Sequence, residues 1–479
     1  MLPSSTTPYD NWTREELIVR LSELDRISSR QRKTHTEKPF DFSAQPLRKI
    51  ALKFCYSGWE YNGLAFQEGH TPLPTVEEVL FNALTQTRLV NPDGGLKGCG
   101  WERCGRTDCG VSAAGQVISL WVRSALKSNK DVDQGDGEGG KGEPDSRKSE
   151  LHYVSILNRV LPDTIRVLAW SPVSPDFSAR FACRYRHYKY FFSSRGLDLS
   201  LMQDAADRLV GEHDFRNLCK LDPAKQITNF KRGVLEAKIN AVSNPEGVVT
   251  DNTPFVLDLV GTSFLYHQVR HIMAILFLVG TGLEHPSVIS ALLNVDADHP
   301  TKSQGLEVVD RKPVYQMTDG FPLMLWDCGY SDSDVRWRVE GDDELQPQVQ
   351  HTGSGTELYD QLHSIHERSV IRTTLDAHHL AAAARYHSPA PLRFPLRAEL
   401  MPLTKTDSQC TMKIPLGGGT FLRTAKYVPL LRRKRLDDVA VANQRWKVGK
   451  GARKLKAHSG ETPRSIGNRS STGLHGSTP

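Results

Sequence analysis

The chain has 479 residues, more than one compact hydrophobic core usually holds, which predicts two or three domains. Hydrophobic residues make up 38%, and basic residues exceed acidic ones by 61 − 55 = 6, which fits a globular protein but does not reveal its partners. The longest apolar stretch, 272–283, contains two glycines and is too short to span a membrane, and eight cysteines without a CxxC pair argue against a disulfide scaffold or a zinc ribbon.

Residues 1–46 are predicted to be an appendage, with one short amphipathic helix followed by a basic linker. Thr13 and Glu16 have capping-box spacing at the start of that helix. Neither a secretory signal nor a mitochondrial presequence is expected, because this segment lacks a basic region before an apolar core and carries early acidic residues. The sparse cysteines favour a reducing compartment, and we expect cytoplasm and nucleus.

Residues 47–172 are predicted to form a first α/β half. Alternating apolar residues predict a strand over 50–56, and Thr75 and Glu78 form a second capping box that begins a helix. A Gly- and Cys-rich loop, a strand over 116–122 and a helix over 150–161 follow. Residues 127–150 carry almost no aliphatic side chains, so a disordered insertion is expected.

Residues 173–331 are predicted to form a second half of similar style. We expect strands over 184–192, 255–260 and 322–326, and helices over 199–210 and 264–279. Alternating strands and helices in two halves indicate an α/β or α+β fold with sheets of modest size. Residues 332–443 are interpreted as a partly helical extension, and 444–479 as a basic disordered tail. The run 432–435 (RRKR) is a candidate nuclear signal or a solvated surface.

Three segments carry candidate chemistry. In 103–115 (RCGRTDCGVSAAG), glycines flank Arg106 and Asp108, so the loop either projects an acid into a cleft or is a surface turn. Cys99, Cys104 and Cys109 are spaced unlike zinc ligands and have no fourth ligand nearby, so no zinc site is expected.

The second segment, 181–192 (FACRYRHYKYFF), places Arg186 and Tyr188 on one face of a strand and Lys189 on the other. Aromatic and basic residues in this arrangement suit base stacking with phosphate contacts, or else simple core packing.

In the third segment, 261–273, Arg270 lies beside an apolar helical stripe. Its charge either pairs with a buried carboxylate or reaches solvent. Thr262 or Ser263 is expected to cap the helix. His267 and His271 are four residues apart but lack the glutamate of an HExxH metal motif.

In this order the three segments resemble the TruA-type family of tRNA pseudouridine synthases. GRTDCGVSAAG is similar to the motif that holds that family's catalytic aspartate, RYRHYKYFF to its tyrosine strand, and GTSFLYHQVRHI to its arginine helix. LNRVLPDTIRV, FSARFAC and GEHDFRNL also match, so the resemblance covers about residues 48–330. The leading helix, the Cys-Gly before RTD and KYVPLLRRKRLDDV are similar to the eukaryotic branch that acts at tRNA positions 38/39.

The resemblance implies two mixed-sheet halves with helices on their outer faces, enclosing a central basic cleft. It implies a tRNA substrate, no cofactor, no metal and no membrane, and often a homodimer. Asp108 would be the catalytic carboxylate, Arg270 its partner and Tyr188 the residue that stacks on the target base. Arg106 would fill the gap left by the flipped uridine, while Arg184, Arg186 and Lys189 would contact phosphates.

Two alternative functions remain at this stage. A catalytically inactive tRNA-binding protein of the same fold would not need a buried acid at position 108. A zinc-dependent RNA enzyme would contain stoichiometric zinc, which the isomerase chemistry does not require.

Overall fold

The computed structural model describes residues 13, 18–20, 40–126, 149–242, 253–295, 307–339, 341, 355–387 and 412–453. The chain divides into two compact units, Met1–Gln45 and Pro46–Pro479. In the first unit, Ile18–Arg20 are helical, while Glu16 and most of the expected helix and linker lie outside the described residues.

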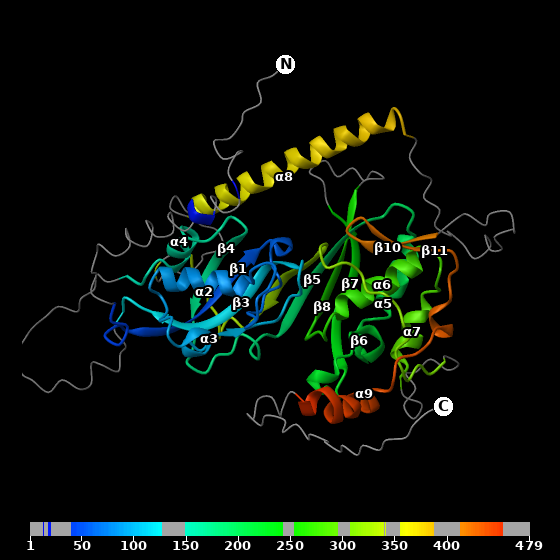
Figure 1. Cartoon of the computed structure of the whole chain (residues 1–479), viewed down its shortest axis with the longest axis horizontal. Coiled ribbons are helices and arrows are strands. Elements are labelled where there is room, and N and C mark those ends of the chain that lie inside the picture. The colour runs from blue at the N-terminus through cyan, green and yellow to red at the C-terminus, as the bar shows by residue number, and fades with distance from the viewer. Residues whose placement is uncertain are drawn as a thin grey trace, which may run out of the picture. The chain divides into compact units, whose positions relative to one another are not determined.

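One nine-stranded sheet runs through the second unit in the order β4-β1-β3-β9-β5-β8-β7-β6, with β2 paired to β3 (Figure 1). Its strands are β1 (Leu47–Tyr56), β2 (Glu102–Arg103), β3 (Ser112–Arg123), β4 (Ile165–Pro172), β5 (Tyr185–Ser193), β6 (Gly211–Asp214), β7 (Lys231–Ala241), β8 (Pro254–Gly261) and β9 (Leu323–Gly329). A separate hairpin joins β10 (Met412–Gly417) to β11 (Thr420–Thr424).

Strand β9 connects the two predicted halves. It pairs in parallel with β3 at Ser112 and Ala113, and antiparallel with β5 on its other side. The other strand pairs are antiparallel. The mixed α/β class is therefore confirmed, but the expected sheets of modest size are wrong, because β9 merges them into one. Sequence periodicity describes each strand separately and contains no information about which strands pair.

Helices cover the sheet and enclose two hydrophobic cores, one per half. The helices of this unit in the described residues are α2 (Val76–Gln86), α3 (Gly95–Gly98), α4 (Tyr153–Asn158), α5 (Leu199–Asp207), α6 (Gln268–Gly280), α7 (Ser287–Leu293), α8 (Gly355–Ala384) and α9 (Val439–Trp446). Short turns are η1 (Gly58–Glu60), η3 (Arg216–Leu218), η4 (Pro223–Lys225), η6 (Leu430–Arg432) and the π-helical η7 (Lys447–Gly451). Helices α2 and α4 pack in the first core, and α5, α6 and α7 in the second. Among the described residues, no helix is long and apolar enough to cross a membrane.

The capping box at the start of α2 is confirmed. Glu78 N donates to Thr75 Oγ1 at 3.3 Å, and Thr75 N donates back to Glu78 Oε2 at 3.3 Å. Helix α6 begins later than expected, at Gln268, so the predicted cap at Thr262 or Ser263 is wrong. Thr262 N still donates to Gly233 O, which continues the hydrogen bonding of the sheet past β8.

Two predicted disordered segments are partly ordered. Glu150, expected in the insertion, is buried and accepts hydrogen bonds from Arg48 Nη1 at 2.9 Å and Ser124 Oγ at 2.7 Å; residues 127–148 lie outside the described part. Residues 444–452, expected in the tail, are helical, because Asp438 caps α9 and Asn443 Nδ2 donates to Ile227 O.

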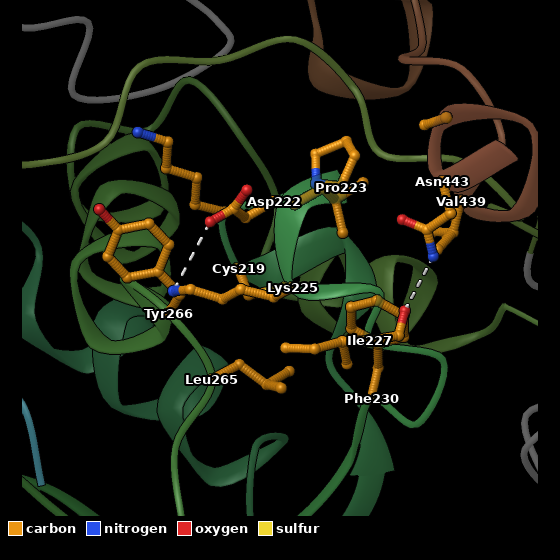
Figure 2. Close-up of a pocket in the computed structure, with 13 residues that line it drawn as sticks. Cys219, Asp222, Pro223, Lys225, Ile227, Phe230, Leu265, Tyr266, Val439 and Asn443 are labelled. Atoms are coloured by element: carbon orange, nitrogen blue, oxygen red, sulfur yellow. Dashed lines mark hydrogen bonds and ion pairs between the residues drawn. The ribbon is translucent and has the colours of Figure 1, made fainter. Parts of the chain in front are cut away.

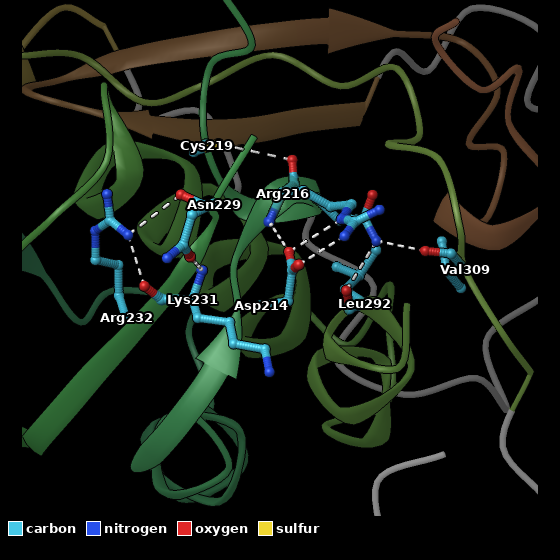
Figure 3. A network of polar contacts seen from close by, with 9 residues as sticks. Asp214, Arg216, Cys219, Asn229, Lys231, Arg232, Leu292 and Val309 are labelled. Carbon is cyan, nitrogen blue, oxygen red and sulfur yellow. Dashed lines mark hydrogen bonds and ion pairs between the residues drawn. The ribbon is translucent and has the colours of Figure 1, made fainter. Parts of the chain in front are cut away.

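The segment GEHDFRNL has a structural role at the edge of the second core. Arg216 donates to both carboxylate oxygens of Asp214, at 3.1 and 2.7 Å (Figure 3). The buried Asn217 Nδ2 donates to Leu292 O and Val309 O, tying this turn to the end of α7. The segment therefore holds strand β6 against the helices that carry the rest of the core.

Asp258 of β8 anchors the face of the sheet opposite Tyr188. His187 Nε2 lies 2.7 Å from its Oδ1, and Lys189 Nζ donates to the same oxygen at 2.6 Å. Burial raises the pKa of Asp258, but hydrogen bonds from His187, Lys189 and Asn240 outweigh this and lower the pKa from 3.8 to about 2. The folded state therefore holds this carboxylate ionised more strongly than the unfolded chain does.

We expect Asp258→Asn to lower the free energy of unfolding by about 2 kcal/mol at neutral pH. Because the folded pKa is depressed, this contribution is present above pH 4 and is lost as the pH falls toward 2, so the difference from wild type should narrow over that range. Urea denaturation followed by tryptophan fluorescence measures it. The control Asp204→Asn, at an exposed ion pair with Arg208, should change stability by about 0.5 kcal/mol or less. A pH-independent gap between wild type and Asp258→Asn would contradict the assignment.

Candidate active site

A buried carboxylate organises the strand that leads into the Asp108 loop. Glu77 of α2 is fully buried and forms an ion pair with Arg103 of β2. The same carboxylate accepts hydrogen bonds from Trp101 Nε1 at 2.8 Å and from Phe66 N at 2.9 Å. A charge in this environment is stable only with such partners, so α2, β2 and the loop after η1 are held together immediately before residue 104.

The loop 104–111 is held by side-chain and backbone contacts with residues 56–64. Tyr56 and Thr107 share a buried hydroxyl–hydroxyl hydrogen bond of 2.6 Å, and Leu64 N donates to Thr107 O at 3.3 Å. A Cβ at Gly58 would lie 2.0 Å from Val111 O, so only glycine permits this approach. The loop that carries Asp108 is therefore supported by its packing against residues 56–64.

Two basic side chains from the second half meet the Asp108 carboxylate. His267 Nε2 lies 3.2 Å and Arg270 Nη1 3.6 Å from its Oδ2. The Asp108 side chain is 23% exposed, whereas those of His267 and Arg270 are 6% and 13% exposed. Both contacts converge on the same oxygen, Oδ2.

Arg270 is aimed by a second contact. Its Nε donates to Thr318 O at 2.8 Å, and Thr318 Oγ1 donates back to Arg270 O at 3.0 Å. Arg270 also lies on the first turn of α6, a helix whose residues are almost all buried. The guanidinium is thus fixed by a rigid helix and by the segment that leads into β9.

His267 is a site residue that the sequence reasoning missed. The sequence pairs it only with His271, as two possible metal ligands. His271 is instead buried against Lys312, 3.2 Å from its Nζ, and burial followed by the Lys312 charge lowers the pKa of His271 to about 2. His267 instead caps α6 in the left-handed region, at φ 59°, where non-glycine residues are uncommon. This backbone conformation turns the imidazole toward Asp108, and no sequence period signals it.

Tyr188 lies on β5, with its ring 5.1 Å from the ring of Phe264 in an edge-to-face arrangement. Burial raises the pKa of its hydroxyl, so Tyr188 is neutral at physiological pH. Its ring is partly buried beside both cores.

The four predicted RNA-binding residues have different environments. Arg106 and Arg184 are exposed. Lys189 lies on the face away from Tyr188, paired with Asp258.

Arg186 donates to four carbonyls: Thr262 O at 2.8 Å, Arg180 O at 2.9 Å, Cys104 O at 3.2 Å and Cys183 O at 3.4 Å. A phosphate contact by Arg186 would have to break some of these hydrogen bonds. In the structure, Arg186 holds together the backbone segments that carry these four carbonyls.

A small pocket adjoins the site on the side of Tyr266. The Tyr266 ring lies 3.8 Å from that of His267. Lys225 Nζ lies 3.7 Å from the centre of the Tyr266 ring, and Figure 2 shows both side chains. The opposite wall comes from Val439 and Asn443 of α9. The C-terminal segment thus lines a pocket beside Tyr266, although α9 lies about 170 residues after Tyr266 in the sequence.

Comparison with known proteins agrees with this geometry. The family model described as tRNA pseudouridine synthase matches residues 205–331, which include His267 and Arg270. The tRNA pseudouridine(38/39) synthase of Saccharomyces cerevisiae is 42% identical over 350 residues, which cover 68% of this chain and 72% of the relative. The chain belongs to the tRNA pseudouridine synthase family.

Relatives in this family extend from animals to archaea. The human tRNA pseudouridine(38/39) synthase is 46% identical over 305 residues, covering 63% of this chain and 59% of the relative. The tRNA pseudouridine synthase A of Methanothrix thermoacetophila is 32% identical over 294 residues, covering 61% of this chain and 86% of the relative. The match to the human protein thus spans less than two thirds of that relative.

The close approach at Gly58 gives a test of how the Asp108 loop is supported. Gly58→Ala should destabilise the protein by about 2–3 kcal/mol, because the new methyl group would force the Val111 backbone to move. Urea denaturation measures the loss. Gly69→Ala is the matched control, since a Cβ there meets nothing within 4 Å, and it should change stability by about 0.5 kcal/mol or less. Equal effects of the two substitutions would show that the loop is not braced at this point.

Proposed function

We propose that this protein isomerises uridines of the tRNA anticodon arm, at positions 38 and 39, to pseudouridine, with Asp108 as the essential carboxylate. The observation that carries the proposal is the convergence of His267 and Arg270 on one oxygen of a loop aspartate. The names of the yeast and human relatives support the choice of tRNA positions.

The reaction breaks the N1–C1′ bond of uridine, turns the base and forms a C5–C1′ bond. The proton on C5 leaves and N1 gains one, so the product is an isomer and no oxidant or reductant is consumed. The Asp108 carboxylate would either attack C1′ or assist the loss of a ribose proton. The Arg270 guanidinium, 3.6 Å from Oδ2, places a positive charge beside this carboxylate.

The other side chains would position the substrate. A uridine must leave its stack to reach Asp108, at a cost of a few kcal/mol that binding of the remaining tRNA offsets. Tyr188 would stack on the flipped base and guide the C5 proton toward water, and exposed Arg106, two residues before the acid, would occupy the vacated space. Exposed Arg184 and the basic residues of α9 and η7 would contact phosphates. A location in both cytoplasm and nucleus belongs to this proposal and is supported by the basic run at 432–435.

Asp108→Asn should abolish isomerisation while leaving tRNA affinity within about threefold of wild type, because an amide keeps the shape but neither attacks nor accepts a proton. Carbodiimide mapping of anticodon-arm uridines, together with a filter-binding assay, measures both quantities. Asp204→Asn, an exposed acid on α5, should be fully active. Full activity of Asp108→Asn would remove Asp108 as the catalyst, and a wild-type protein that binds tRNA without isomerising it would indicate the binding-only alternative.

His267 is expected to position Asp108 through its Nε2 contact. His267→Gly keeps the left-handed backbone and removes the imidazole, so kcat should fall about 100-fold with tRNA affinity unchanged. His267→Asn, whose side chain also tolerates φ > 0 and offers an amide donor, should recover part of this loss. His285→Asn, at the exposed start of α7, is the control. A rise in KM with kcat unchanged would instead indicate that His267 binds RNA.

A further inference from the structure

Three buried thiols converge beside the candidate active site. The sulfur atoms of Cys104, Cys183 and Cys328 all lie within 4.8 Å of one another, and the three residues are 2%, 8% and 3% exposed. Cys104 opens the Asp108 loop, Cys183 precedes β5 and Cys328 lies in β9. In the described part of the chain, this is the only group of three or more Cys, His, Asp or Glu side chains with metal-binding proximity.

The spacing of the sulfur atoms fits a metal ion with little movement. An ion with metal–sulfur bonds of about 2.3 Å and three sulfur ligands in a plane separates the sulfurs by about 4 Å. The observed separations reach at most 4.8 Å, so closure around an ion requires shifts of under about 1 Å. Buried cysteines also pack as small apolar side chains, but packing alone does not require three of them, from three distant segments, to meet at one point.

A positive charge is already present next to the thiols. The Arg186 guanidinium donates to the carbonyls of both Cys104 and Cys183, and Arg186 is the β5 partner of Cys328 in the sheet. Thiolates are the metal-binding form of cysteine, and a fixed guanidinium offsets part of their charge.

We propose that Cys104, Cys183 and Cys328 form a binding site for a thiophilic metal ion with three thiolate ligands. Soft sulfur donors select ions such as Cu⁺ and Zn²⁺ over oxygen-seeking ions. Three protein ligands suit the low coordination number of Cu⁺, whereas Zn²⁺ would take a fourth ligand from outside the protein. Binding displaces the protons of the cysteine thiols and forms metal–sulfur bonds without any change of oxidation state.

The site would act on structure and would not touch the substrate. An ion there would join Cys104 at the start of the Asp108 loop to Cys183, just before β5, and to Cys328 of β9. Strand β5 carries Tyr188, and β9 connects the two halves. The proposal does not depend on the proposed function, since the isomerisation itself requires no metal.

The test uses the full-length protein, reduced and stripped by a chelator, then incubated separately with Zn²⁺ and with Cu⁺ under anaerobic conditions. After gel filtration, mass spectrometry of the metal content should show about one ion per chain in at least one arm. Cys104→Ser, Cys183→Ser and Cys328→Ser should each lower that content at least about tenfold. Cys219→Ser and Cys99→Ser, which change buried cysteines outside the cluster, should retain the ion.

A second measurement covers the case in which a cluster variant fails to fold. X-ray absorption of the loaded wild-type protein should show three sulfur ligands around the ion. The proposal is overturned if wild type retains neither ion, if the control variants lose as much metal as the cluster variants, or if the ion has nitrogen and oxygen ligands in place of three sulfurs. Because these readouts do not involve isomerisation, their failure would leave the proposed function untouched.

Discussion

The contact between the Asp108 carboxylate and the His267–Arg270 pair is the interaction on which the rest of this structure depends. The acid comes from the first half of the chain, and both basic groups come from the start of α6 in the second half. Neither half could supply this arrangement alone. The largely buried Arg270 guanidinium needs a negative partner, which the Asp108 carboxylate supplies, so one half compensates a charge that the other half buries.

The surrounding fold holds Asp108, His267 and Arg270 in position for this contact. Strand β9 pairs with β3 and β5 and fixes the distance between the loop that carries Asp108 and the strand that carries Tyr188. Glu77 and Glu150 act in the same way within the first half, because each is buried and each holds together segments that are distant in the sequence. Arg186 clamps the same central region through backbone carbonyls. The buried charges of Glu77, Glu150 and Arg186 therefore fix the positions of backbone segments, and these fixed segments make the site rigid.

The Asp108 site and the cysteine cluster are neighbours in the fold but differ in chemistry. The Asp108 side chain is partly exposed, whereas Cys104, Cys183 and Cys328 are buried. A metal at the cluster would tie together the three segments whose mutual placement determines where Asp108 and Tyr188 sit. Asp258 and its two basic partners stabilise the opposite face of the same strands. The central strands are thus supported from both faces, which suits a site that must hold its shape while a nucleotide enters and leaves.

Local sequence patterns determined several secondary-structure elements and the positions of the main motifs of this protein. The capping box at Thr75, the strand carrying Tyr188, the helix carrying Arg270 and the glycine-flanked loop of Asp108 follow from patterns within a few residues, because hydrogen-bonded caps, side-chain periodicity and turn geometry are local properties. The family followed from the order of those motifs. Only the tertiary structure decided the single sheet, the role of His267, the carbonyl contacts of Arg186 and the meeting of Cys104 with Cys183 and Cys328. These depend on strand pairing and on one left-handed residue, and contacts between residues tens to hundreds of positions apart leave no period in the chain.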